Sequence, residues 1–229
     1  MTGERRAPGE RRTSRPGGGM GAKEAGIIVL ARHGEPALSR EQRLSAADYA
    51  AWWAVYEETG LKPGQVAPPS LLAHAERAGV IVSSTRRRSV ETAFAVAGGR
   101  EVEADPDLIE APLPPPHWPH WIKLRPRIWG VVARFWWWWF NHHDGQETRR
   151  EAQARANLVA ERLIAHAEAG QNVLVIAHGF FNTMVRLALQ KRGWKLVENQ
   201  GFKYWSFSRL EMAFDYRNRD AGAAFRPRP

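Results

Sequence analysis

The sequence contains no cysteine, which excludes every class of protein that depends on thiols. Disulfide-stabilised scaffolds, thiolate metal centres and cysteine nucleophiles all require that residue. The chain also lacks an apolar run that approaches the roughly 18 residues indicating a membrane-spanning helix. Its 229 residues, 44% of them hydrophobic, are enough to build one substantial core. We therefore expect a soluble protein of the cytoplasm.

Basic residues are in excess, and their distribution matters more than the net charge of +9. Residues 1–25 carry six Lys and Arg against three Asp and Glu, and residues 217–229 carry four against one. Both segments hold few bulky apolar residues, so we expect them to be disordered basic tails. The domain between them, residues 26–216, has a net charge of only +3. Because charge in tails attracts nucleic acid without reading its sequence, we expect no specific nucleic-acid partner.

Short aliphatic runs alternate with longer helical patterns between the tails, which is typical of βαβ units. The pattern predicts an α/β fold: a three-layer α/β/α sandwich with a mostly parallel central sheet. Residues 112–146 fit neither pattern and are interpreted as a Trp-rich insertion that caps one end of the sheet. The predicted strands are Ile27–Ala31, Val80–Ser83, Val102–Ala104 and Val173–Ala177, with Tyr204–Leu210 at an edge. The predicted helices are Glu41–Thr59, Arg86–Ala97, Thr148–Ala169 and Phe181–Gln190.

Two segments share one pattern, an apolar strand that ends in Ala and is followed by His and Gly. In the first, Arg32 precedes His33 and Gly34, and in the second the pair is His178 and Gly179. Because the carboxyl ends of neighbouring parallel strands face one crevice, we expect the two imidazoles to converge. The glycines let the backbone turn sharply beside them.

A third segment, Ser84–Ala93, lies at the junction of a predicted strand and a predicted helix. It contains Arg86, Arg87 and Arg88 beside a helix start, whose free N–H groups favour anions. Guanidinium groups add paired donors that match phosphate oxygens. The segment therefore predicts a phosphate site, although a solvated charged helix face is the alternative interpretation.

These three segments, with Leu108-Ile109-Glu110 after the next strand, resemble the histidine phosphatase superfamily, which has the phosphoglycerate mutase-like fold. The four pieces occur in order between residues 26 and 210. The resemblance implies that His33 is the nucleophile and forms a phosphohistidine. It also implies that Arg32, Arg88 and His178 bind the phosphoryl oxygens, with Arg86 and Arg87 as possible substitutes for Arg88.

The resemblance places the proton donor at Glu110, which protonates the leaving oxygen and then acts as base on the water. Nearby carboxylates compete for this role, namely Glu103, Asp105 and Asp107. A neutral imidazole at His33 is a suitable nucleophile near pH 7 if its other nitrogen is held by an acceptor. The implied chemistry uses neither a metal nor a cofactor, so we expect neither.

Two departures from the family pattern accompany these matches. Pro36 stands where many members have Ser or Thr, and Ser39 stands where many have Asn. Phe180 and Phe181 follow the second His-Gly where another glycine is frequent, which predicts bulk beside the pocket. These differences argue against a standard sugar-phosphate mutase and leave the hydrolytic residues unchanged.

The expected function is hydrolysis of a small-molecule phosphomonoester through phosphohistidine, and a phosphomutase of the same fold is an alternative. Residues 129–140 hold five tryptophans and have three interpretations. The rings bury against the body as a cap, they wall a pocket for a bulky or apolar ester, or they seat the protein on a membrane surface beside Arg125, Arg127 and Arg134. The last interpretation leaves open a non-catalytic module that docks a partner or a membrane.

Overall fold

The computed structural model describes residues 24–213. The basic tails predicted at residues 1–25 and 217–229 therefore lie outside the described residues, apart from Glu24 and Ala25. Within the described range, no helix is long and apolar enough to cross a membrane.

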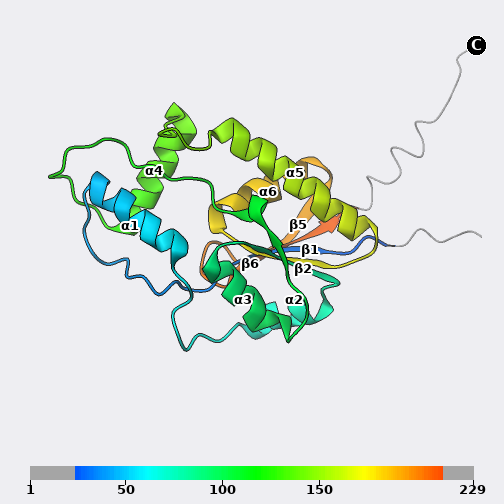
Figure 1. The fold of residues 1–229 in the computed structure, drawn as a ribbon. Coiled ribbons are helices and arrows are strands. Elements are labelled where there is room, and N and C mark those ends of the chain that lie inside the picture. Colours follow the sequence, from blue (N-terminus) through cyan, green and yellow to red (C-terminus); the bar gives the residue numbers. More distant parts are fainter. Residues whose placement is uncertain (1–23, 214–229) are drawn as a thin grey trace, which may run out of the picture.

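A six-stranded sheet forms the centre of the fold (Figure 1), with strand order β3-β2-β4-β1-β6-β5. The strands β1 to β4 pair in parallel, whereas β6 pairs antiparallel with both β1 and β5. The predicted mostly parallel sheet is thereby confirmed. The predicted edge position of the last strand is wrong, because β5, which the pattern did not predict, lies outside β6. The bounds are β1 Ile28–Arg32, β2 Val80–Ser84, β3 Glu103–Asp105, β4 Val173–Ala177, β5 Trp194–Asn199 and β6 Phe207–Met212.

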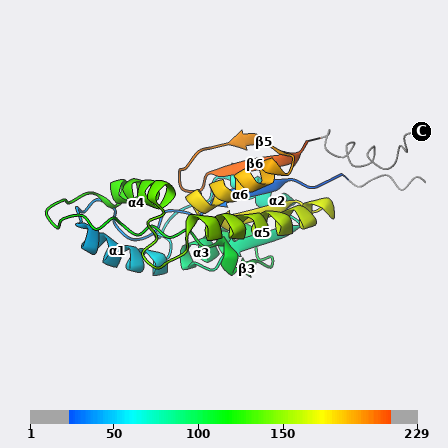
Figure 2. The same ribbon diagram turned by 90° about the horizontal axis from the view of Figure 1, so that it is seen from above.

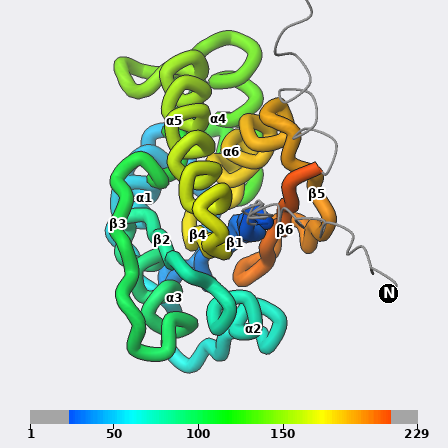
Figure 3. The backbone as a smooth tube through the Cα atoms, turned by 90° about the vertical axis from the view of Figure 1, so that its right-hand side faces the viewer, coloured from blue at the N-terminus to red at the C-terminus, as the bar shows by residue number. Residues whose placement is uncertain are grey.

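Helices cover both faces of the sheet, as the three-layer prediction requires (Figure 3). One layer contains α5 (Arg149–Glu168) and α6 (Gly179–Lys191), and the other contains α2 (Pro69–Arg77) and α3 (Arg87–Ala97). The longest helix, α5, begins with a capping box between Thr148 and Glu151. It buries residues spaced three and four apart against the sheet, namely Ala152, Ala156, Val159, Ala160, Leu163 and Ala167.

The remaining two helices form a cap beyond the carboxyl ends of the parallel strands (Figures 1 and 2). They are α1 (Ala46–Glu58) and α4 (Pro126–Phe140), and their shared core is aromatic, with Tyr49, Trp52 and Trp129 all buried. The cap predicted at residues 112–146 is therefore present, and it includes α1 as well. We call the unit formed by α1 and α4 the cap.

The sequence pattern did not predict that the insertion contains a helix. Pro126 occupies the first turn of α4, where its missing N–H costs nothing, and Asn141 ends the helix in a left-handed conformation with φ +50°. Apolar residues dominate α4, and its two arginines, Arg127 and Arg134, lie on one face of the helix.

The tryptophans of α4 divide between the interior and the surface. Trp129 and Trp137 are fully buried, whereas Trp139 is 70% exposed and Phe140 is 65% exposed. Trp129 also donates a hydrogen bond to the carbonyl oxygen of Leu44 at 2.7 Å. The buried-cap interpretation therefore holds for the inner face of α4, and the outer face is apolar and uncovered.

Candidate active site

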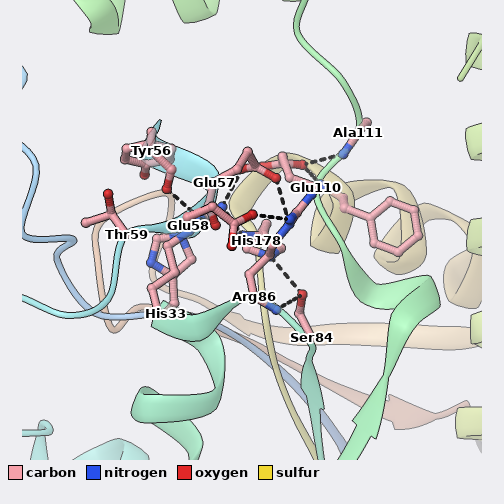
Figure 4. A network of polar contacts seen from close by, with 12 residues as sticks. His33, Tyr56, Glu57, Glu58, Thr59, Ser84, Arg86, Glu110, Ala111 and His178 are labelled. Carbon is pink, nitrogen blue, oxygen red and sulfur yellow. Dashed lines mark hydrogen bonds and ion pairs between the residues drawn. The ribbon is translucent and has the colours of Figure 1, made fainter. Parts of the chain in front are cut away.

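The two histidines lie side by side at the carboxyl end of the sheet, as expected from their strands. The parallel pairing of β1 with β4 sets Arg32 opposite Ala177, so the residues that follow, His33 and His178, leave the sheet together. Their ring centroids are 5.1 Å apart, and the residues are only 2% and 1% exposed, respectively. Figure 4 shows both rings within one polar network.

The tautomer of His33 is set by the backbone. Its Nδ1 lies 2.7 Å from the carbonyl oxygen of Gly34, and because a carbonyl only accepts, Nδ1 carries the proton. Nε2 therefore carries no proton, and its lone pair accepts from Arg88 Nε at 3.3 Å. Burial, together with the positive charges of Arg88 and Arg32, lowers the pKa of His33 well below its usual value. His33 is therefore a neutral base at neutral pH, as a nitrogen nucleophile must be.

The turn after His33 requires glycine. A Cβ on Gly34 would lie 2.5 Å from the ring of Trp205, closer than atoms of these types approach. The N–H of Gly34 donates to the hydroxyl of Thr92 at 2.9 Å, which ties the turn to α3. The Gly34 carbonyl oxygen is thereby held where it accepts a hydrogen bond from Nδ1–H of His33.

Arg88 connects the two histidines and is itself buried. Its Nε donates toward His33 Nε2 at 3.3 Å, and its Nη2 donates to His178 Nδ1 at 3.3 Å. Its charge is balanced by the Glu57 carboxylate at 2.8 Å, and its Nη1 donates to the Tyr56 carbonyl oxygen at 2.9 Å. The guanidinium is therefore held rigidly between the rings.

The two neighbouring arginines, considered as substitutes for Arg88, have other partners. Arg87 is exposed and forms an ion pair with Glu91 at 2.7 Å. Arg86 contacts the far oxygen of Glu57 at 2.8 Å. Of these three arginines, only Arg88 reaches both histidines.

His178 is neutral as well. Its Nδ1 accepts from Arg88, so its Nε2 carries the proton and donates to the hydroxyl of Ser84 at 3.0 Å. Burial, together with the charge of Arg88, lowers the pKa of His178 well below its usual value. Both nitrogens of this neutral ring therefore have partners, and the ring brings no charge of its own into the interior.

Arg32, at the end of β1, lines the same pocket as the two histidines. Its guanidinium carbon lies 4.4 Å from the ring centre of Tyr204, and its Nη1 donates to the carbonyl oxygen of Phe202. Burial lowers the pKa of Arg32 from its usual value. Its Nε is buried and has no hydrogen-bond partner among the described residues.

Glu110 lies across the pocket from these groups, where the chain leaves a short 3₁₀ turn at Pro106–Leu108. Its two oxygens accept the first free N–H groups of α6, from Phe181 at 2.8 Å and Phe180 at 3.3 Å. The guanidinium of Arg134 lies 3.5 Å from the same carboxylate. The helix start therefore fixes the position of the carboxyl group.

The competing carboxylates point elsewhere. Asp105 and Asp107 both pair with Arg162 of α5, at 2.7 and 2.9 Å, and Glu103 is exposed on the edge strand. Of the four candidates, only Glu110 lines the pocket that contains the histidines.

A cavity of about 60 Å³ collects these side chains between the sheet and the cap. Its strand side holds Arg32, His33, Arg88 and His178, and its other lining residues are Arg40, Trp53, Tyr56, Glu110, Leu113, Arg127, Gly130 and Arg134. All five predicted site residues therefore border one space with room for a compact anion.

The family is decided by this arrangement together with the sequence. The family model of the histidine phosphatase superfamily (branch 1) matches residues 28–218. The chain belongs to that superfamily.

Solved structures agree with the fold of a superfamily member. A mycobacterial hydrolase is 24% identical, with 82% of this chain and 89% of that chain covered and a TM-score of 0.52. A mycobacterial glucosyl-3-phosphoglycerate phosphatase, solved with VO3, is 23% identical, with 81% and 92% covered and a TM-score of 0.52. No curated protein shows significant similarity to the chain.

The residues that depart from the superfamily pattern, Pro36, Ser39, Phe180 and Phe181, do not line the cavity, although the Phe180 ring lies beside the cavity-lining Arg134. Phe181 is buried beneath Arg155, whose guanidinium carbon is 3.9 Å from the ring centre. Phe180 packs against Trp137 of the cap, with ring centroids 5.9 Å apart. Their backbone N–H groups hold Glu110, and neither ring is part of the cavity lining.

Several pocket residues of this superfamily member were not identified from the sequence. Glu57 and Tyr56, at the end of α1, support Arg88, and Arg127 and Arg134 line the cavity rather than facing a membrane. A signal for the last two was present, because they lie two helical turns apart on α4 with pocket-lining Gly130 between them. That signal becomes visible only once the segment is known to be helical.

Among residues 24–213, no group of three or more His, Asp or Glu side chains is arranged to hold a metal ion. The loop histidines of the insertion form looser pairs, such as His117 and His142 with ring centroids 5.4 Å apart.

Proposed function

We propose that this protein is a cytoplasmic phosphatase that hydrolyses a small-molecule phosphomonoester through a phosphohistidine on His33. The observation that carries the proposal is the convergence of a proton-free His33 Nε2, buried Arg88 and a second neutral histidine in one cavity. Membership of the histidine phosphatase superfamily supports it.

In the first step, His33 Nε2 attacks phosphorus, the Nε2–P bond forms, and the bond from phosphorus to the ester oxygen breaks. Arg32, Arg88 and His178 surround the phosphoryl oxygens, whose charge spreads in the transition state. The proton of His33 stays on Nδ1 and remains hydrogen-bonded to the Gly34 carbonyl oxygen, which stabilises the positive charge that the ring gains. Because the groups are already fixed, little reorganisation is needed during the reaction.

Glu110 supplies the proton that the leaving oxygen takes, so the alcohol departs neutral. In the second step, the resulting carboxylate accepts a proton from water, the water oxygen bonds to phosphorus, and the Nε2–P bond breaks. Inorganic phosphate is released, and both His33 and Glu110 return to their starting states. The cycle uses only groups of the protein and a water molecule, so a chelator is expected to leave the rate unchanged.

The test is phosphate release from 4-nitrophenyl phosphate by the native protein, His33→Ala and His120→Ala. We expect His33→Ala to lose at least about 10⁴-fold in kcat, because nucleophile removal leaves only binding contributions. His120→Ala, an exposed histidine of the insertion, is the matched control and keeps the native rate. Acid-labile label from [³²P]-substrate trapped on native protein but not on His33→Ala supports the intermediate. Full turnover by folded His33→Ala excludes the mechanism.

A second candidate function, docking on an anionic membrane surface, is favoured by the outer face of α4. Val131 is 66% exposed and Trp139 is 70% exposed, and both lie on the side of the helix away from the body. The exposed Lys123 and Arg125 precede the helix and complement anionic headgroups in charge.

Sedimentation with vesicles of phosphatidylcholine, with and without phosphatidylglycerol, tests this second function. We expect binding only to the anionic vesicles, and its loss in the double variant Val131→Ser, Trp139→Ala. Phe94→Ala, which removes an exposed ring from α3, is the matched control and retains binding. If the double variant sediments as much as the native protein, membrane docking through this face is overturned. It is also overturned if the native protein is a dimer and the double variant is a monomer, because the face then forms the contact between two copies.

A further inference from the structure

We infer that the substrate carries a second anionic group in addition to the phosphoryl group, and that the arginines of the cap side hold it. This inference rests on the proposed phosphatase function. It assigns roles to Arg40, Arg127 and Arg134, which the phosphoryl chemistry leaves unused.

The charge balance of the cavity is the first reason. Five guanidinium groups line it, and the only carboxylate among the lining residues is Glu110. Arg32 and Arg88 lie beside the histidines, where a phosphoryl group of charge about −1.5 to −2 is expected. With Glu57 beside Arg88, Glu110 near Arg134 and a phosphoryl group bound, the lining still has an excess of about one positive charge, which a second anion balances.

The geometry of α4 is the second reason. Arg127 and Arg134 lie seven residues apart, so their side chains leave the same face of the helix two turns apart. Gly130 lies between them and also lines the cavity. A Cβ at Gly130 would meet only the Tyr49 hydroxyl, at 3.8 Å, so the cavity wall is open at this point of the helix.

Unsatisfied donors are the third reason. The Nε atoms of Arg40 and Arg134 are buried and have no hydrogen-bond partner among the described residues. A buried donor without an acceptor destabilises the fold, so such donors are seldom retained without a use.

The existing contacts orient these two guanidinium groups and leave the buried donors free. Arg40 Nη1 donates to the Tyr204 hydroxyl at 2.7 Å, and the Arg134 guanidinium carbon lies 5.0 Å from the ring centre of Phe180. Arg134 has one carboxylate neighbour, Glu110, at 3.5 Å, but two backbone N–H groups also bind that carboxylate. An anion on the substrate supplies the missing acceptors, and a guanidinium fork suits either a carboxylate or a phosphate.

Matched pairs of small substrates test the inference. Phosphoglycolate is compared with ethyl phosphate, which has a methyl group in place of the carboxylate. Longer ω-phosphooxy carboxylates are compared with alkyl phosphates of equal chain length, and propane-1,3-diyl bisphosphate provides the phosphate arm. We expect kcat/KM for at least one doubly anionic compound to exceed that of its partner by about tenfold or more. The best chain length reports the spacing, and the bisphosphate arm reports which anion is preferred.

Variants then assign the effect to the cap. Arg127→Ala should lower the ratio of kcat/KM between the two members of the best pair by about tenfold. Arg125→Ala is the matched control: it is two residues away, pairs with Glu41 at 3.6 Å and does not line the cavity, so it should leave the ratio unchanged.

The outcomes separate this inference from the function on which it rests. Hydrolysis of the alkyl phosphates with a ratio near one at every chain length overturns the second-anion inference and leaves the phosphatase intact. If no compound is hydrolysed, the proposed function fails, and calorimetric titration of the same pairs into His33→Ala still decides the inference. Equal affinity for both members of each pair overturns it, and tighter binding of the doubly anionic members supports it.

Discussion

The strand side of the pocket presents His33, His178 and Arg88, each buried and each held by at least two hydrogen bonds or ion pairs. The cap side presents Arg127 and Arg134 from a helix whose outer face is exposed to solvent. The two histidines are fixed by the pairing of β1 with β4, and Arg88 of α3 is held between them by Glu57. The side chains on the cap side depend on how α4 packs against α1 and α6.

This difference separates reaction chemistry from substrate choice. In-line attack on phosphorus requires positions fixed to fractions of an ångström, and a paired sheet supplies them. A helix on top of the sheet can present different side chains without disturbing the strands beneath it. We therefore expect changes on the strand side to act on kcat and changes on the cap to act on selectivity and stability.

Among variants that keep the His33 nucleophile, the largest expected effect comes from Glu110→Gln, which keeps an acceptor for the α6 N–H groups but removes the proton donor. We expect kcat for ethyl phosphate to fall by about 10²–10⁴-fold. The loss should be smaller for 4-nitrophenyl phosphate, because 4-nitrophenolate leaves without protonation. Steady-state rates for the two esters provide the measurement, with exposed Glu103→Gln as control. Equal losses for both leaving groups would show that Glu110 only positions other groups.

A second effect separates the two faces of the cap. Trp137 is fully buried and donates to the carbonyl oxygen of Glu147 at 3.0 Å, so Trp137→Ala should lower the free energy of unfolding by about 3–5 kcal/mol. Trp139→Ala, two residues further along α4, should change it by less than about 0.5 kcal/mol. Urea unfolding of both variants gives the comparison. Similar losses at the two positions would mean that the outer face of α4 is covered.

The smallest effect is a pH dependence of stability from the strand-side histidines. Their pKa values are lowered in the folded protein, so the unfolded chain takes up protons first as the pH falls below about 6.5. The free energy of unfolding should therefore decrease between pH 7 and pH 5.5, by about 1 kcal/mol per histidine. Urea unfolding across this range should show a smaller decrease for His33→Gln than for native protein, and His120→Gln should match native. An unchanged slope in His33→Gln would mean that this ring is readily protonated in the fold.

Prediction from the sequence succeeded where a local pattern coincided with a strand end. The two His-Gly pairs and the Ser84–Ala93 segment each follow an apolar run, and parallel pairing brings such ends together in any fold of this class. The position of Arg88 rested on a family pattern, and the roles of His33, Arg88 and Glu110 in the reaction stay predictions.

Prediction missed features that arise from contacts between distant segments. The helix Pro126–Phe140 was not predicted because different faces of it contact α1, contact α6 and are exposed to solvent, so most of its positions are apolar. Glu57 carries no local mark of importance, since its role depends on the end of α1 reaching Arg88 across 31 residues of sequence. The strand β5 was missed because only one of its six residues is fully buried, so no apolar run marks it.

The sequence by itself determined the α/β class, the family and the two histidines, because strand periodicity and the residues after each strand are local properties. Only the tertiary structure decided which of three adjacent arginines faces the histidines, where the tryptophans lie and which cap residues line the pocket. Those outcomes depend on helix orientation and on packing between segments far apart in the chain, and no local pattern encodes that geometry.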